Sequence, residues 1–206
     1  MKGLFISFEG IEGTGKTIQS KLLFEYLIEK GFQAVLTEEP GGTRIGRTIR
    51  DILLSIDNTE MTPVTELLLY NASRMQHVQE VILPALKKGK VVITDRFSDS
   101  TVAYQGFGRG IELHLINAIE QVVTGGLKPD ITMLLDLDVT VGLQRNKGIN
   151  KEDRIELEDI AFHKRVRDGY HALAAKEPER IHVIDASKSI EHIHGSIKKI
   201  AHDLLS

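Results

Sequence analysis

The stretch that decides the fold is LFISFEGIEGTGKT, residues 4–17. It begins as an apolar strand, and from Gly10 it reads G-x-x-x-x-G-K-T, the phosphate-binding loop or P-loop. Glycines there allow successive backbone N–H groups to point at the phosphate oxygens of a nucleotide. Residues 16–30 predict a helix whose N-terminal dipole adds to this binding. The predicted nucleotide-binding residues are Gly10, Ile11, Glu12, Gly13, Thr14, Gly15, Lys16 and Thr17.

Two side chains of the loop have predicted chemical roles. Lys16 is expected to reach the β- and γ-phosphates, and the Thr17 hydroxyl is placed to ligate Mg²⁺. The apolar run at 90–94 ends in Asp95, which is the Walker B pattern, where a carboxylate assists Mg²⁺. An Asp there can instead cap the next turn. Because a P-loop needs such a partner, we predict a metal site at Thr17 and Asp95.

Composition is that of an ordinary globular chain. With 206 residues, 41% hydrophobic and 27% charged, one domain over 1–206 with a sizeable core is expected. The net charge of −3 argues against a surface-wide polyanion site, so no nucleic-acid partner is predicted. The absence of cysteine excludes disulfides and suits the reducing cytoplasm. Residues 1–8 lead straight into the P-loop and no apolar run has membrane-spanning length, so we expect no targeting signal and no membrane association.

Short apolar runs alternate with helical patterns along the chain. Strands are expected at residues 4–8, 33–37, 90–94, 131–135 and 181–184. Helices after the first are expected at residues 44–55, 63–87 (one or two helices), 112–123, 155–176 and 190–205. Such alternation predicts an α/β fold: a five-stranded parallel sheet with helices on both faces, the three-layer sandwich of P-loop NTPases. The polar segment 145–154 predicts a mobile surface loop, which would serve as a lid.

Six fragments, the P-loop among them, resemble thymidylate kinases of the bacterial type. In order they are FEGIEGTGKT at 8–17, EPGGT at 39–43, ASR at 72–74, DRF at 95–97, DSTVAYQG at 99–106 and DRIE at 153–156. Each fragment is weak alone, but six in the order and spacing of the family are specific. The resemblance implies a kinase that moves the γ-phosphoryl group of ATP to dTMP with Mg²⁺, giving dTDP. It also implies a homodimer.

The same resemblance assigns side chains to the acceptor. Arg50 and Arg96 would hold the dTMP phosphate, although both could be solvated surface charges. Tyr70 would stack on thymine with Arg74 as donor to its carbonyl, and their i, i+4 spacing puts both on one side of a helix. The alternative is a core tyrosine and a solvated arginine. The complete substrate set implied by the resemblance is Glu12 (sugar 3′-hydroxyl), Glu39, Arg50, Tyr70, Arg74, Arg96, Thr101, Tyr104 (sugar 2′ position) and Gln105 (base edge).

Three departures and two alternatives accompany this interpretation. The family more often has Phe in place of Tyr70, and Ser or Asn in place of Thr101. It usually has Arg in place of Glu38. Another nucleoside or nucleoside monophosphate kinase of the same fold stays open and would differ in the base pocket. A GTP-dependent switch is excluded, since it needs D-x-x-G after the third strand and N-K-x-D, whereas the chain reads DRFS and NKGI.

The catalytic cation is predicted to come from the lid segment 145–154. Some thymidylate kinases carry this arginine in the P-loop, where this chain has Gly13. Bacterial relatives with a small residue there often carry several lid arginines, but Lys147 and Ile149 occupy two of those places. Arg145 and Arg154 therefore remain, and they complete the predicted catalytic set with Lys16, Asp95 and Arg96. Alternatively, Arg154 could form an ion pair with the acidic residues that follow it and have no catalytic role.

We expect Arg145→Ala and Arg154→Ala each to lower turnover at least tenfold, about 1.4 kcal/mol of transition-state stabilisation, with a smaller change in dTMP affinity. The physical reason is that the moving phosphoryl group spreads negative charge that an arriving cation stabilises. Steady-state kcat and KM measure both effects. Normal turnover in both variants, together with an essential cation elsewhere, would make the lid assignment wrong and Arg96 the leading candidate.

Overall fold

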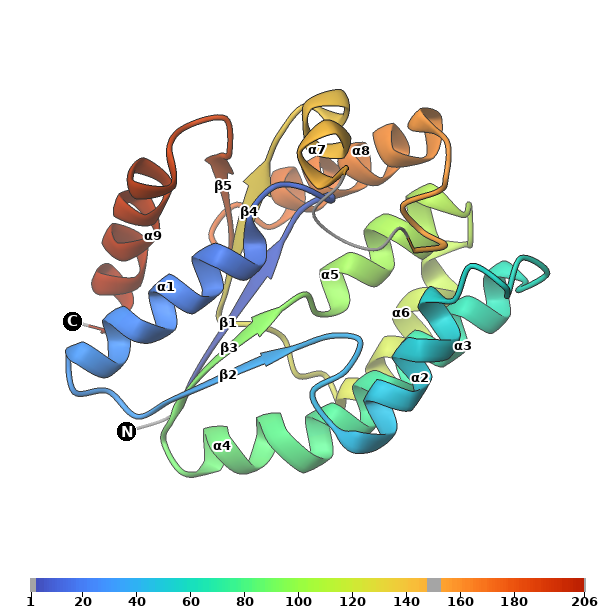
Figure 1. Ribbon diagram of the computed structural model, residues 1–206. Helices are drawn as coiled ribbons and strands as arrows, with labels where there is room; N and C mark the ends of the chain where they lie inside the picture. The colour runs from blue at the N-terminus through green and yellow to red at the C-terminus, as the bar shows by residue number, and fades with distance from the viewer. Residues whose placement is uncertain (1–2, 148–152, 206) are drawn as a thin grey trace.

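The computed structural model describes residues 3–147 and 153–205. Its centre is a fully parallel sheet with the strand order β2-β3-β1-β4-β5 (Figure 1). The strands are β1 Leu4–Glu9, β2 Ala34–Glu38, β3 Val91–Asp95, β4 Ile131–Asp136 and β5 Ile181–Asp185. All five predicted strands are confirmed, with ends that shift by one residue at most. The sheet confirms the predicted α/β class.

Helices cover both faces of this sheet (Figure 1). On one face lie α1 (Lys16–Glu29) and α9 (Ile190–Leu205), which contact each other. The opposite face and the cleft end carry α2 Arg44–Leu54, α3 Pro63–His77, the π-helical segment η1 Val78–Ile82, α4 Leu83–Lys87, α5 Ser98–Thr101, the π-helical segment η2 Val102–Gly108, α6 Leu113–Thr124, α7 Val139–Asn146 and α8 Ile160–Lys176.

Alternate residues of the strands build the two cores. On β1, Ile6 and Phe8 are fully buried against α1 and α9, in a cluster that includes Leu23 and Leu27. Phe5 points to the opposite face and packs with η1 and α4. This period of two, with both faces apolar, is what a parallel sheet between helical layers requires. The predicted three-layer sandwich is therefore confirmed.

Four helical regions differ from the prediction, and one of them is α7, which is not among the expected helices. The expected helix 155–176 begins at Ile160, because the Asp159 carboxylate caps it by accepting from Phe162 N at 2.6 Å. The expected segment 63–87 contains a π-helical turn just before Pro84, whose ring cannot donate an intrahelical hydrogen bond. The sequence pattern did not predict α5 with η2, because residues 98–108 include two glycines and several polar residues, which have low helix propensity.

Leu27→Ala should lower the free energy of unfolding by about 2–5 kcal/mol, because it removes a fully buried side chain between α1 and the sheet. Ile28→Ala is the matched control, since its side chain is 48% exposed and its loss should change stability by only about 0.5 kcal/mol. Urea unfolding followed by circular dichroism measures both. Equal effects of the two changes would contradict the placement of α1.

Candidate active site

A cleft with a volume of about 770 Å³ opens at the carboxyl ends of the strands. This is the edge where open parallel sheets bind ligands. The cleft brings together most of the predicted residues: Glu12, Gly13, Thr14, Gly15, Lys16, Thr17, Glu39, Arg50, Tyr70, Arg74, Asp95, Arg96, Thr101, Tyr104, Gln105 and Arg145. Gly10 and Ile11 belong to the backbone of the loop and do not line the cleft. Arg154 does not line it either.

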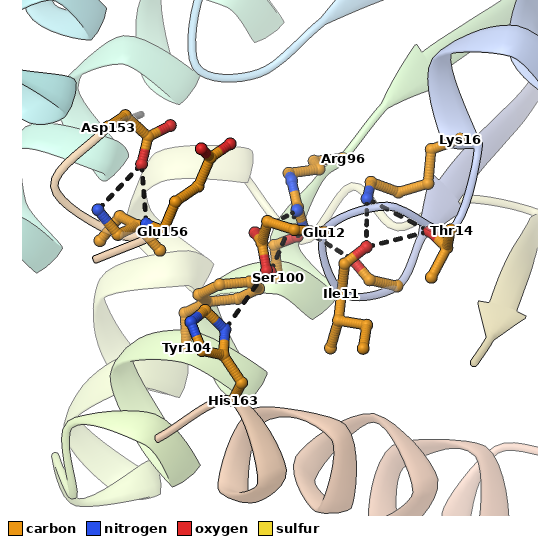
Figure 2. A network of polar contacts seen from close by, with 12 residues as sticks. Ile11, Glu12, Thr14, Lys16, Arg96, Ser100, Tyr104, Asp153, Glu156 and His163 are labelled. Carbon is orange, nitrogen blue, oxygen red and sulfur yellow. Dashed lines mark hydrogen bonds and ion pairs between the residues drawn. The ribbon is translucent and has the colours of Figure 1, made fainter. Parts of the chain in front are cut away.

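The P-loop has the backbone that its glycines allow. Gly10, Gly13 and Gly15 have φ values of 139°, 72° and 88°, which other residues rarely adopt. The Lys16 ammonium donates to Ile11 O at 2.7 Å and lies 3.4 Å from Thr14 Oγ1, so it is held over the loop (Figure 2). Burial, together with the charge of Arg96, lowers the pKa of Lys16 to about 8. The cation is thus held in place before a phosphate arrives.

Thr17 and Asp95 meet at the predicted metal position. The Thr17 hydroxyl donates to Asp95 Oδ2 at 2.5 Å, joining the start of α1 to the end of β3. Both groups offer hard oxygen ligands, which suit Mg²⁺. Within residues 3–147 and 153–205 no cluster of three acidic, His or Cys side chains could form a metal cage. The donor set therefore fits Mg²⁺ carried on nucleotide phosphates, which needs only one or two protein ligands.

Arg96 crosses the middle of the cleft. Its backbone has a φ of 72°, a strained value for a residue with a side chain. Its guanidinium donates to Gly10 O at 3.0 Å, to Glu12 Oε1 at 2.9 Å and to the Tyr104 hydroxyl at 3.0 Å (Figure 2). These bonds fix a cation between the P-loop and η2, which carries Tyr104.

Glu12 is the anionic partner of Arg96. The Tyr104 hydroxyl donates to Glu12 Oε1 at 2.6 Å, and the fully buried His163 places Nδ1 3.4 Å from Glu12 Oε2 (Figure 2). Burial alone would raise the pKa of Glu12, but His163 and the charges of Arg96 and Lys16 hold that pKa well below its usual range. Glu12 is therefore an ionised acceptor. Sequence reasoning missed His163, because it lies on α8 outside the quoted fragments.

A further part of the cleft wall is built on a buried arginine. Arg74 is 2% exposed; its Nε donates to Glu39 Oε2 at 2.7 Å and its Nη1 to Thr101 Oγ1 at 2.6 Å. Nη1 also pairs with Glu120. The second Glu39 oxygen lies 2.8 Å from His77 Nδ1. Both Glu39 oxygens are thus used within the protein, so Glu39 positions Arg74.

Arg50 and Glu38 stand at the more open part of the cleft. Arg50 Nη1 donates to Pro40 O at 2.7 Å and lies 3.9 Å from Glu38 Oε2. The side chains are 37% and 56% exposed, respectively, so this contact contributes little to stability. Both residues line the cleft, as the sequence predicts for Arg50. Tyr70 also lines it, one helical turn before Arg74 on α3.

The two predicted lid arginines are placed differently. Arg145 on α7 lines the cleft and donates to Ala186 O at 2.9 Å. Arg154 donates to Leu53 O at 3.1 Å, pairs with Glu66 Oε2 at 2.6 Å, and lines a separate pocket of about 330 Å³. Its catalytic role stays a prediction that these contacts do not support, because its charge is matched by a buried carboxylate. Gly148, Ile149 and Lys151 lie outside the described residues.

Besides His163, sequence reasoning missed a buried carboxylate that shares the partners Ser100 and Tyr170 with Arg96. Glu9, the last residue of β1, is fully buried and accepts from Phe97 N at 2.7 Å, from Ser100 Oγ at 2.6 Å and from the Tyr170 hydroxyl at 3.0 Å. Burial, aided by the charge of Asp99, raises the pKa of Glu9 to about 7. Its position directly before Gly10 is the only sequence signal for it.

Fold and site together define the class. A P-loop with a Thr–Asp pair at one end of a cleft, and arginines, tyrosines and a glutamine at the other, is the arrangement of a P-loop kinase for a small phosphorylated acceptor. The family model for thymidylate kinase matches residues 8–197. The chain belongs to the thymidylate kinase family.

Individual relatives agree over nearly the whole chain. It is 51% identical to the thymidylate kinase of Geotalea uraniireducens over 201 residues, 95% of this chain and 94% of that one. It is 50% identical to that of Halothermothrix orenii over 200 residues, 96% and 95% of the two chains. The crystal structure of thymidylate kinase from Ehrlichia chaffeensis matches with a TM-score of 0.79 at 38% identity, covering 98% of this chain and 99% of that one. Among the described residues, no helix combines the length and apolarity needed to span a membrane.

Glu9→Gln should make stability less dependent on pH. In the native state the carboxyl keeps a proton that the unfolded chain, with a pKa of 4.5, releases. As pH rises from 4.5 to about 7, the free energy of unfolding of the wild-type protein should therefore fall by up to about 3 kcal/mol relative to that of Glu9→Gln. Urea unfolding across this range measures the difference. Glu29→Gln, an exposed change, is the control, and a pH-independent difference for Glu9→Gln would contradict the raised pKa.

Proposed function

We propose that this protein transfers the γ-phosphoryl group of ATP to dTMP, giving ADP and dTDP for dTTP synthesis and DNA replication. The observation that carries the proposal is one continuous cleft with a phosphate-binding loop and Lys16 at one end and buried Arg74 with Gln105 at the other. Membership of the thymidylate kinase family supports it. Another nucleoside monophosphate kinase of the same fold is not favoured.

The donor half binds ATP through backbone N–H groups of residues 10–17, and Lys16 stabilises charge that develops on the β- and γ-phosphates. Thr17 and Asp95 would hold Mg²⁺, which would neutralise phosphate charge when bound. Because Lys16 and Arg96 are already fixed by hydrogen bonds, they reorganise little as charge moves.

In the acceptor half, Arg96 and Arg50 hold the dTMP phosphate in line with the donor. Glu12, kept ionised, accepts from the sugar 3′-hydroxyl. Tyr70 stacks on the thymine ring, and Arg74 donates to its carbonyl oxygen. Each of these contacts places the acceptor phosphate beside the P-loop.

Arg145 supplies the lid cation in this proposal. It lies on the cleft wall and its only described hydrogen bond is to a backbone carbonyl, so no carboxylate offsets its charge in that bond. The homodimer and the cytoplasmic location expected from the sequence are part of the same proposal. They derive from the resemblance and from the absence of cysteine.

The proposed activity is tested by coupled measurement of ADP release with ATP, Mg²⁺ and a panel of nucleoside monophosphates. The expected result is the highest kcat/KM with dTMP, and a sharp loss of activity when the metal is chelated. A higher kcat/KM with a purine or cytosine nucleotide would overturn the proposal in favour of another kinase of the same fold.

Tyr104→Ala should narrow the preference for dTMP over its ribonucleotide by about tenfold in kcat/KM, because a buried ring at the sugar 2′ position excludes a hydroxyl. Tyr104→Phe is the matched control: it removes the bonds to Glu12 and Arg96 but keeps the ring, so the preference should persist. Parallel kinetics with both nucleotides give the ratio. An unchanged ratio in the alanine variant would remove Tyr104 from the sugar pocket.

A further inference from the structure

A buried carboxylate that the mechanism does not use lies behind the base end of the cleft. Glu66 on α3 is 1% exposed. Its Oε1 accepts from Gln105 Nε2 at 2.8 Å and from Arg109 Nε at 3.1 Å, and its Oε2 accepts from Arg109 Nη2 at 3.0 Å. Arg154 Nη2 lies 2.6 Å from Oε2. One anion is thus held by two arginines and by the amide of a cleft residue.

The charge state of Glu66 decides how it can bind the amide. Burial alone would raise its pKa, but hydrogen bonds from Arg109 and Gln105 and the charges of both arginines lower the pKa below its ordinary value. An ionised carboxylate only accepts hydrogen bonds. Gln105 must therefore turn its NH₂ group toward Glu66, which directs its carbonyl oxygen the other way.

That carbonyl oxygen is available to a ligand. Gln105 lines the cleft, and no described residue donates to its Oε1. Arg74, also on the cleft wall, can only donate, and its described bonds use Nε and Nη1. The base end of the cleft therefore offers one donor, from Arg74, and one acceptor, from Gln105.

The donor and the acceptor discriminate between pyrimidines. Thymine presents an acceptor at O4 and a donor at N3–H, which complement Arg74 and Gln105 Oε1. Cytosine presents the reverse, an NH₂ donor at C4 and an acceptor at N3. With the amide fixed, cytosine would leave buried polar groups unpaired, and this is the kind of mismatch that gives large discrimination.

We propose that Glu66 is a specificity-determining positioning residue, which fixes the Gln105 amide so that the pocket accepts thymine and rejects cytosine. This inference rests on the proposed function, because it assumes that Arg74 and Gln105 face the base. Glu66 itself touches no substrate. It acts through the orientation of one amide.

The test compares dTMP with 5-methyl-dCMP, which keeps the methyl group and differs only at positions 3 and 4 of the ring. In Glu66→Gln the partner of Gln105 can both donate and accept, so the amide can turn over. The kcat/KM ratio for dTMP over 5-methyl-dCMP should fall about tenfold or more. Arg109→Gln is the matched control: it weakens the same ion cluster but leaves the carboxylate, so the ratio should stay within about twofold of wild type.

A second variant separates orientation from general damage. In a Gln105→Met background there is no amide to orient, so adding Glu66→Gln should leave the ratio unchanged. A full effect of Glu66→Gln in that background would overturn the proposal, as would an unchanged ratio in the single variant. If Glu66→Gln does not fold, the wild-type protein with ¹⁵N-labelled glutamine provides the test. The Gln105 NH₂ protons should exchange slowly and stay in place when dTMP binds, and a large shift of these protons would overturn the proposal.

Failure of this inference and failure of the proposed function are distinguishable. A wild-type enzyme that does not phosphorylate dTMP would contradict the function. A wild-type enzyme that prefers dTMP, with a ratio insensitive to Glu66→Gln, would leave the function standing and remove Glu66 from specificity.

Discussion

The parallel pairing of β1 with β3 is the constraint on which the site depends. Phe8 stands opposite Asp95 in this pair, and Arg96 N donates to Phe8 O at 2.9 Å. Because of this pairing, the start of the P-loop lies beside Asp95 and Arg96 at the same point of the sheet edge. From there Thr17 reaches Asp95, and Arg96 reaches back to Gly10 O. The P-loop, Asp95 and Arg96 are thus anchored at one point of the sheet edge.

Around that point, three arginines are paired with buried or largely buried carboxylates. Arg96 pairs with Glu12, Arg74 with Glu39, and Arg109 with Glu66. Buried ion pairs add little net stability, because removing two charges from water costs about as much as their attraction returns. What they supply is geometry: donors and acceptors are held in fixed directions before a ligand arrives. The raised pKa of Glu9 shows the energetic cost of burying a carboxylate, to which the charge of Asp99 adds.

The sequence predicted those features that depend on residues close together in the chain. The strands were predictable because both faces of a parallel sheet are apolar. The P-loop was predictable because its glycine spacing is what allows the backbone to bind phosphate. His163 and Glu66 were not predictable, since their importance comes from contacts with residues far away in the sequence. Arg154 shows the remaining limit. Its motif indicates a functional segment, whereas the direction of its side chain is decided by a buried carboxylate, Glu66, on α3.

The position of Arg145 follows from close backbone packing. A Cβ on Gly13 would lie 2.0 Å from Gly142 O, and a Cβ on Gly142 would lie 2.6 Å from Glu12 O. The P-loop and α7 therefore touch through two glycines, and the loop has no room for an arginine of its own unless α7 moves. Because α7 also carries Arg145, the contact that excludes a cation from the P-loop brings another to the wall of the same cleft. The same contact thus fixes Arg145 on the cleft wall, where the proposed function assigns it the role of the lid cation.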